Sequence, residues 1–318
     1  MCYTWRVGLL LPAPPTLGGR TYPSAYMQLF SPLVSLSIQA PTRFPAATHS
    51  AQTLLSPVLN WFFRPLLLLG VLLFTTVQAA QLRICYEDID QPPWTYLDGQ
   101  GVTLDLLRKV ANELGEEFQF FIKPWKRCLG EVKLGIVDAV VGAVELPERR
   151  VYSEYPKDAN GKTNPSASLW HDDFNIFVLE QSTVEWDGQQ FHQLNGQIAA
   201  QAGYSSVTWL KDQGLPVTSE SKSAEEVLRL INIGVAEAGV IQGAEAVKLV
   251  QTDLRFKGKI RVLARPYRSE PLYFIVSKLS YAKAPARFDA IWQSIARQRQ
   301  SPEYRAAETK ARKAFLRP

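Results

Sequence analysis

The chain is poor in the residues that most often carry enzyme chemistry. It has three histidines, three cysteines and two methionines among 318 residues. Beyond residue 79, only His171, His192, Cys85 and Cys128 remain of the histidines and cysteines. The same stretch has no HExxH, no CxxC pair, no P-loop and no serine nucleophile elbow. These absences argue against zinc, nucleotide and hydrolase chemistry, and we predict no metal site, no cofactor and no catalytic residue.

Acidic residues are absent from residues 1–79, although this segment contains Arg6, Arg20, Arg43 and Arg64. The formal net charge of the whole chain is +5, so four of these charges belong to the segment and the remainder is nearly balanced. A basic excess confined to a leader is no argument for a nucleic-acid surface. Nucleic acid is therefore not an expected partner.

Long apolar runs are also scarce, and the clearest one follows Arg64. It reads Pro65-Leu-Leu-Leu-Leu-Gly-Val-Leu-Leu-Phe74 and leads into Thr75-Thr-Val-Gln-Ala79. A positive residue, an apolar run too short to span a bilayer comfortably and small residues at its end are typical of a secretory signal. We expect cleavage near Ala79 and a periplasmic mature protein, and the alternative is an uncleaved anchor.

The first 60 residues are an unusual beginning for a secretory signal, because the charged region that precedes the apolar run is normally short. We interpret residues 1–79 as a leader with an over-extended start, and translation from Val58 would leave a short charged region containing Arg64. Cys85 is the first cysteine after the apolar run and lies too far along for lipidation. A lipid anchor is therefore not expected.

Short apolar strands alternate with helices over residues 82–150. The predicted elements are strands at 82–86, 118–122 and 138–141 and helices at 101–115 and 125–134. Pro92 and Pro93 end the first strand, because proline removes a backbone donor and bars both helix and central strand. Such alternation implies mostly parallel pairing, and ligands of such sheets lie beyond the carboxyl ends of the strands.

The mature portion, roughly 240 residues, is long enough for two α/β lobes of ordinary size. The elements expected later are strands at 174–179, 197–200, 216–217, 238–241 and 270–276 and helices from 205, at 223–233, at 244–250 and between 284 and 315. The first and last of these strands are expected to cross between the lobes. The predicted division is lobe 1 over 80–173, lobe 2 over 174–268, and a return strand with C-terminal helices over 269–318.

Several short motifs stand at the ends of the early strands. They are Pro92-Pro93-Trp94, Gly101 before the first helix, Trp125 ten residues before Gly135, Asp138-Ala139, and Pro147-Glu148-Arg149. With these motifs the chain from residue 82 onward resembles the type II periplasmic solute-binding proteins, in the polar amino-acid branch called solute-binding family 3. The resemblance implies an α/β fold of two lobes with a ligand cleft between them. It also implies capture of a small, polar, carboxylate-bearing, amino-acid-like ligand for an ABC transporter.

Arg149 is predicted to hold the carboxylate of the ligand. It follows a strand end, and a guanidinium presented there can bind a carboxylate with two parallel hydrogen bonds. In the family this position grips the α-carboxylate of the ligand. The alternative is that Arg149 or Arg150 pairs with Glu145 or Glu148 at the surface.

Other ligand contacts are expected around the first strand and after it. Tyr86 and Trp94 fit the cleft wall and the core equally well, and Glu87 supplies a hydrogen-bond acceptor. Trp125 is expected to serve packing rather than the ligand. These aromatic and acidic groups therefore join Arg149 in the predicted site.

The second lobe contributes the turn Gly203-Tyr204-Ser205-Ser206, which lies between a strand and a helix. Free backbone N–H groups and hydroxyls at such a turn favour an anion. In the family this turn completes the carboxylate site, so Tyr204 and Ser205 are predicted contacts. A plain helix N-cap formed by Ser205 or Ser206 is equally consistent with the sequence.

Two positions depart from the family members that bind α-amino acids. Those members commonly have Ser or Thr on the strand before the arginine, where this chain has Gly142 and Val144. They have Asp for the ligand ammonium where this chain has neutral Gln242, which cannot make a charge-assisted bond. Gly142 and Gln242 remain predicted contacts. The ligand then lacks an α-amino group, or its ammonium is held by another acid: Glu87, Asp88 or Glu245.

Cys85 and Cys128 are the two cysteines of the mature portion. In an oxidising periplasm they could form one disulfide. The alternative is a pair of buried free thiols, because Cys85 lies in a core strand and Cys128 in the first turn of a helix. The sequence leaves both open.

Binding without turnover is the predicted activity, with the protein as a monomer. Some relatives of this fold are dehydratases that act on prephenate or arogenate, and Glu87, Glu145 or Glu245 could serve as their general acid. A further alternative is delivery of the ligand to a membrane sensor instead of an ABC permease. The charged C-terminal helix is interpreted as a solvated face rather than a docking surface.

Overall fold

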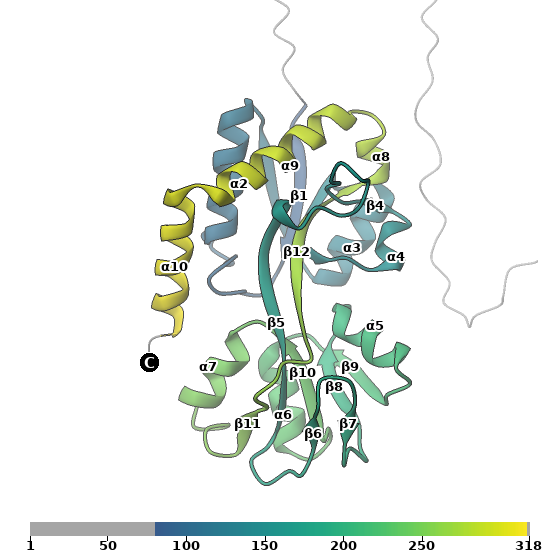
Figure 1. Ribbon diagram of the computed structural model, residues 1–318, viewed down its shortest axis with the longest axis vertical. Coiled ribbons are helices and arrows are strands. Elements are labelled where there is room, and N and C mark those ends of the chain that lie inside the picture. Colours follow the sequence, from purple (N-terminus) through teal and green to yellow (C-terminus); the bar gives the residue numbers. More distant parts are fainter. Residues whose placement is uncertain (1–79, 317–318) are drawn as a thin grey trace, which may run out of the picture. The chain divides into compact units, whose positions relative to one another are not determined.

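The structure is a computed structural model that describes residues 80–316 (Figure 1). The predicted leader, its signal peptide and the alternative start at Val58 lie outside the described residues. Within 80–316, none of the helices combines the length and apolar character needed to cross a membrane. The same residues contain no group of three or more His, Cys, Asp or Glu side chains placed to hold a metal ion.

Two α/β lobes are joined by two long strands, β5 (Ser168–Leu179) and β12 (Arg268–Ser277) (Figure 1). The strands follow the order β2-β1-β3-β12-β5-β10-β8-β9. The remaining strands of this path are β1 (Leu82–Glu87), β2 (Phe118–Lys123), β3 (Ala139–Val144), β8 (Ile198–Gln201), β9 (Val217–Ser221) and β10 (Ala238–Gln242). Pairing is parallel among β1, β2 and β3 and among β8, β9 and β10, whereas β5 and β12 pair antiparallel to their neighbours.

Helices of the first lobe cover both faces of its strands (Figure 1). They are α2 (Val102–Leu114), α3 (Trp125–Leu134), α4 (Pro147–Arg150), α8 (Lys278–Tyr281), α9 (Pro285–Gln300) and α10 (Pro302–Leu316). Leu104, Leu107 and Ala111 of α2 are buried at helical spacing, as the sequence pattern predicts. Gly115 ends this helix in the left-handed conformation, with φ of 66°, which favours glycine.

The second lobe has the helices α5 (Ser205–Asp212), α6 (Ala224–Asn232) and α7 (Glu245–Thr252). The Ser223 hydroxyl accepts a hydrogen bond of 3.2 Å from the Glu226 backbone N–H and so caps α6. Short elements complete the chain: β4 (Ser153–Glu154), the 3₁₀ turn η1 (Pro165–Ala167), β6 (Glu185–Trp186), β7 (Phe191–His192) and β11 (Ile260–Val262).

The first crossing strand is longer than its sequence pattern predicts. The sequence favours a strand at 174–179 after an irregular loop, whereas β5 begins at Ser168. His171, Asp172 and Asp173 interrupt the apolar pattern at this point, although Asp172 and Asp173 pair with residues of β12. The polar segment is a strand because it lies at the junction of the lobes, where the sheet continues between them.

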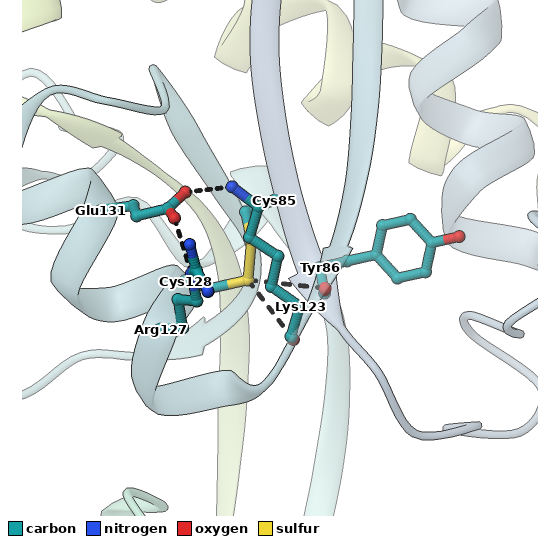
Figure 2. The surroundings of a disulfide bond; sticks show 6 residues. All are labelled: Cys85, Tyr86, Lys123, Arg127, Cys128 and Glu131. Atoms are coloured by element: carbon teal, nitrogen blue, oxygen red, sulfur yellow. Dashed lines mark hydrogen bonds and ion pairs between the residues drawn. A yellow bond between two sulfur atoms is a disulfide. The ribbon is translucent and has the colours of Figure 1, made fainter. Parts of the chain in front are cut away.

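A disulfide joins Cys85 of β1 to Cys128 of α3, whose Cα atoms are 5.6 Å apart (Figure 2). Both cysteines are fully buried. Glu131, on the next turn of α3, pairs with Arg127 at 3.0 Å and with Lys123 of β2. Of the two alternatives that the sequence leaves open, the structure has the disulfide. It fastens α3 to the strand whose last residue is Glu87.

The C-terminal helix α10 packs on α2 and α9 of the first lobe and also reaches the second lobe. At its end the Lys248 ammonium of α7 donates a hydrogen bond of 2.9 Å to the Phe315 carbonyl and lies 4.8 Å from the Phe315 ring centroid. About one turn before this end, the Arg312 guanidinium lies 4.3 Å from the ring centroid of Trp94 in the first lobe. The sequence predicts packing on the first lobe but not these further contacts.

Candidate functional site

Two small adjoining cavities lie between the lobes, where β1, β3, β8 and β10 end. The first is lined by Glu87, Gln91, Trp125, Gly142, Val144, Arg149, Tyr204, Ser205 and Gln242. The second is lined by Ile89, Asp90, Gln91, Pro92, Trp94, Asp172, Gln201, Tyr204, Gln242, Gly243, Ala244 and Glu245. Their volumes are about 10 Å³ and 20 Å³, on the order of one water molecule each. The lobes are therefore closed on each other, and Gln91, Tyr204 and Gln242 belong to both cavities.

Arg149 is a buried cation at the first cavity. The short helix α4 begins with Pro147 and turns Arg149 back beneath β3, where its guanidinium donates to the Val144 carbonyl at 2.9 Å. A second N–H donates to the Gly203 carbonyl of the other lobe at 3.1 Å. The residue is 3% exposed, and burial lowers its pKa below the ordinary value.

None of the ion pairs among residues 80–316 includes Arg149. The surface pairing that the sequence allows for this motif belongs to its neighbour, because Arg150 pairs with Glu145 at 2.5 Å. The Arg149 guanidinium thus has two neutral carbonyl partners and no carboxylate. Burial of such a charge is costly unless an anion joins it.

Glu87 is a buried acid at the same cavity, with an exposed fraction of 5%. The Tyr204 hydroxyl of the second lobe donates to Glu87 Oε2 at 2.5 Å. The Gln91 amide donates to the same oxygen at 2.5 Å and to the Tyr204 hydroxyl oxygen at 3.1 Å. Burial is the main cause that raises the pKa of Glu87 to about 7, although both hydrogen bonds lower it.

Trp125 lines the first cavity, although the sequence favours a packing role for it. Its indole N–H donates to the Gly203 carbonyl at 3.0 Å, and its ring packs edge-on to Tyr204 with centroids 6.4 Å apart. The Gly203 carbonyl therefore accepts from both Trp125 and Arg149 of the first lobe. The two roles that the sequence separates, packing and cleft lining, are combined in this side chain.

The turn before α5 brings Tyr204 and Ser205 to the first cavity, where the sequence predicts them. Tyr204 is the N-cap residue, and no side-chain hydrogen bond caps this helix. Ser206 is buried, and its hydroxyl has no hydrogen-bond partner in the described part of the chain. The plain N-cap by a serine side chain, which the sequence also allows, is not formed.

Gly142 is a close-packed position in the wall of the first cavity. Its φ is +84°, and a Cβ built there would lie 2.4 Å from an atom of the Trp170 ring. The Trp170 ring stacks on Trp94, with centroids 5.3 Å apart and an interplanar angle of 18°. Gly142 thus makes room for an aromatic pair whose Trp94 member lines the second cavity.

Asp172 of β5 lines the second cavity and is absent from the sequence-based prediction. Its Oδ2 accepts hydrogen bonds of 3.3 Å from the Trp170 indole N–H and from the Gln242 amide. Burial raises the pKa of Asp172 to about 7. The acid that the sequence lacks at position 242 is therefore found beside it, on the neighbouring strand.

Glu245, the first residue of α7, is a third acid of the cleft and lines the second cavity. Burial raises its pKa to about 7, and the charges of Asp90 and Glu225 contribute further. The sequence names Glu245 as one possible partner for a ligand ammonium. It lies at this cavity together with Asp172.

Tyr86 is placed in the core of the first lobe rather than at either cavity. It is 2% exposed, packs edge-on to Phe120 at 6.3 Å between centroids, and donates a 3.3 Å hydrogen bond to the Tyr96 carbonyl. It is the one predicted ligand contact that lines neither cavity. Trp94 lines the second cavity. The remaining predicted contacts all line the first cavity: Glu87, Gly142, Arg149, Tyr204, Ser205 and Gln242.

No protein-family model and no curated protein matches the chain. Solved structures do. A histidine kinase sensor domain with similarity to periplasmic binding proteins aligns with a TM-score of 0.60 and 15% identity, over 74% of this chain and 97% of that one. An amino acid ABC transporter substrate-binding protein from Streptococcus pneumoniae, bound to L-arginine, aligns with a TM-score of 0.57 and 16% identity, over 75% and 97%.

An ancestral amino acid-binding protein, a precursor of cyclohexadienyl dehydratase, aligns with a TM-score of 0.56 and 18% identity. The alignment covers 74% of this chain and 96% of that one. Such likenesses at low identity concern the fold, and the fold class expected from the sequence is confirmed. Residues 80–316 have the two-lobed α/β fold of the type II periplasmic binding proteins.

Proposed function

We propose that the protein is a periplasmic solute-binding protein that captures a small, polar, amino-acid-like ligand between its lobes. The ligand carboxylate binds to Arg149, and no covalent chemistry is required. The observation that carries this proposal is the buried Arg149 guanidinium, which lines an interlobe cavity with neutral carbonyls as its partners. A carboxylate with two parallel hydrogen bonds is the anion that best fits a guanidinium.

Ligand entry requires the lobes to part, because each cavity has room for about one water molecule. The interlobe contacts that would break include the bonds to the Gly203 carbonyl, the bonds of Tyr204 with Glu87 and Gln91, and the bond from Thr208 to Glu148. The main chain crosses between the lobes at β5 and β12, which would act as the hinge. Ligand binding would then shift the population toward the closed form.

The closed, loaded protein would deliver its ligand to an ABC permease. The structural likeness to a substrate-binding protein of an amino acid ABC transporter supports this partner. The likeness to a histidine kinase sensor domain supports delivery to a membrane sensor as the alternative. A permease or a kinase encoded beside this chain would discriminate the two, and the predicted signal peptide places either encounter outside the cytoplasm.

A dehydratase-like activity is the second candidate, and the acids of the cleft favour it. Burial raises the pKa values of Glu87, Asp172 and Glu245 to about 7, a range suited to a general acid at neutral pH. The likeness to a precursor of cyclohexadienyl dehydratase fits this candidate. Product formation from prephenate or arogenate, lost on changing one of these acids while the protein stays folded, would establish it.

Thermal unfolding of the protein from Ala80 tests the binding proposal. The panel is the common L-amino acids, small carboxylates, amines and short peptides, each with wild type, Arg149→Met and Arg150→Met. A ligand present at a hundredfold its Kd stabilises the folded protein by about 2.7 kcal/mol. The proposal requires a shift of the midpoint with at least one carboxylate, lost in Arg149→Met and kept in Arg150→Met.

Arg150 is the matched control because it lies next in the chain but pairs with Glu145. A midpoint shift that is equal in the two variants would show that Arg149 does not bind the ligand. No shift with any carboxylate would show that the ligand lies outside the proposed class.

A further inference from the structure

The C-terminal helix α10 packs on the first lobe, but its last turn contacts the second (Figure 1). Near its start Tyr304 is buried, and the Lys109 ammonium of α2 pairs with Glu303 at 2.6 Å. At its end the Lys248 ammonium of α7 donates a hydrogen bond of 2.9 Å to the Phe315 carbonyl. The same ammonium lies 4.8 Å from the Phe315 ring centroid. One lysine of the second lobe thus binds both the backbone and the ring of a single residue of α10.

This contact joins the two lobes beside the second cavity. Helix α7 begins at Glu245, which lines that cavity, and Lys248 follows three residues later. Residues three apart are neighbours on the surface of a helix, so one side of α7 carries both. On the first lobe, Trp94 lines the same cavity and has the Arg312 guanidinium of α10 over its ring. The last turn of α10 therefore contacts both walls of the cleft from outside.

Lys248 and Phe315 line neither interlobe cavity, so they are placed where they cannot touch a ligand in either one. Within residues 80–316, no ion pair includes Lys248, and its ammonium makes its one hydrogen bond to the Phe315 carbonyl. Hydrogen bonds and cation–π contacts both weaken steeply with distance. A motion that separates α7 from α10 would therefore lose both interactions together.

The closed arrangement of the lobes is thus held at two separate places. Inside the cleft, Tyr204 of the second lobe donates to Glu87 of the first. Outside the cleft, Lys248 of the second lobe binds to Phe315 of the first. A ligand leaves only after the lobes part, so a contact that stabilises the closed form slows its release.

We infer that the contact between Lys248 and Phe315 holds the lobes closed, and that these two residues determine ligand affinity without touching the ligand. This inference rests on the proposed function and adds to it a determinant of affinity outside the cleft. The effect lies in the rate of release, because the contact is complete only after the lobes have closed on the captured solute.

Isothermal titration and stopped-flow tryptophan fluorescence of the protein from Ala80 test the inference. The probes are L-arginine, L-glutamine, L-glutamate and succinate. Lys248→Met removes the ammonium and keeps an unbranched side chain. For every probe that binds to the wild type, we expect K248M to bind about three- to tenfold more weakly. The dissociation rate should rise by most of this factor, with a smaller change in the association rate.

Lys257→Met is the matched control. Lys257 is an exposed residue of the second lobe that follows α7, and its ammonium makes no hydrogen bond or ion pair within residues 80–316. This change removes the same charge from the same lobe and should leave affinity and dissociation rate as in the wild type. The stoichiometry of each titration gives the folded fraction, so a variant that is partly unfolded is recognised independently of its affinity.

Phe315→Leu is a second variant, which removes the ring and leaves the backbone carbonyl in place. We expect F315L to bind the same probes about two- to threefold more weakly. In the K248M background the same change should have no further effect, because the ammonium that contacts the ring is already absent. Non-additivity of the two changes would show that they act through one contact.

The possible failures are distinguishable. A K248M protein whose affinity and dissociation rate equal those of K257M would overturn the inference and leave the carboxylate site on Arg149 intact. Tighter binding by K248M would overturn it as well, because the contact would then favour the open form. No binding of any of the four probes by the wild type would overturn the proposed function for these solutes, and this inference with it.

Discussion

Tyr204 of the second lobe donates a hydrogen bond of 2.5 Å to the Oε2 atom of Glu87 in the first lobe. Gln91 donates to the same oxygen, also at 2.5 Å. Glu87 is the last residue of β1, and Tyr204 directly precedes α5. One buried carboxyl oxygen thus links the two lobes, and its protonation bears on the stability of the closed form.

Glu87→Gln should change how the free energy of unfolding depends on pH. Burial raises the pKa of Glu87 from 4.5 to about 7, so the folded protein keeps a proton that the unfolded chain releases. The contribution of Glu87 to stability therefore falls as pH rises from about 4.5 to about 7, and it is constant above that range. Relative to wild type, E87Q should gain on the order of 2–3 kcal/mol between pH 4 and pH 8.

Urea unfolding of the unliganded protein at pH 4 and pH 8 measures this gain. Glu220→Gln is the control, because Glu220 is an exposed residue of β9 whose carboxylate makes no hydrogen bond or ion pair within residues 80–316. An E87Q protein whose stability difference from wild type is the same at both pH values would contradict the prediction.

Gly142→Ala should destabilise the protein, because the backbone at Gly142 has a positive φ and the new methyl group would lie 2.4 Å from the Trp170 ring. Strain at this φ and overpacking together cost about 2–4 kcal/mol. Gly130→Ala is the control, since a Cβ there meets nothing within 4 Å and Gly130 lies inside α3. That change should stabilise by up to about 1 kcal/mol. Denaturant unfolding compares the two variants. A loss of less than about 0.5 kcal/mol in the free energy of unfolding of G142A would contradict the packing argument.

Removal of the disulfide should lower the free energy of unfolding. Both cysteines belong to the first lobe, so the second lobe loses no cross-link. Cys85 and Cys128 are 43 residues apart in the chain, and closure of a loop of that length stabilises by about 4 kcal/mol in the chain-entropy account. Cys85→Ala combined with Cys128→Ala should lose up to this amount, and reductant should affect wild type alone. Urea unfolding with and without reductant measures both. Two free thiols in denatured, unreduced protein would show that the bond is absent.

Local patterns in the sequence predict those helices and strands whose first and last residues are marked by nearby start and stop residues, such as proline and glycine. Helix α3 begins at Trp125, directly after Pro124, and ends before the left-handed Gly135, as predicted. Arg149 belongs to the same kind of case, because the strand end and the Pro147 that place it are close in the chain. The strand end and the resemblance to the family together predicted its place at the cleft, whereas the motif alone left a surface ion pair open.

Asp172 shows what such patterns leave out. Its neighbours in the cleft, Gln242 and Trp94, are remote in the sequence, and they meet it because β5 lies beside β10 at the junction of the lobes. An acid inside a polar segment reads as a loop residue when the pairing of that segment is unknown. Tyr86 is the converse, since its position at a strand end fits a cleft wall, while its ring is turned into the core against Phe120.

Arg312→Ala should loosen the C-terminal helix and the aromatic wall behind the cleft. The Arg312 guanidinium lies 4.3 Å from the Trp94 ring centroid and pairs with Glu308, so its loss removes a cation–π contact and an ion pair. We expect a loss of about 1 kcal/mol in the free energy of unfolding. Amide hydrogens in residues 302–316 should also exchange faster, by the factor that corresponds to a loss of about 1 kcal/mol in local stability.

Lys310→Ala is the matched control for this change, because Lys310 is an exposed residue of α10, two positions before Arg312. It should leave both stability and exchange within about 0.5 kcal/mol of wild type. The comparison separates anchoring of α10 by Arg312 from a general effect of removing positive charge from the helix. Equal exchange rates in the two variants would mean that Arg312 is a solvated residue, as the charge pattern of the sequence alone suggests, and that α10 is held by its contacts with α2 and α9.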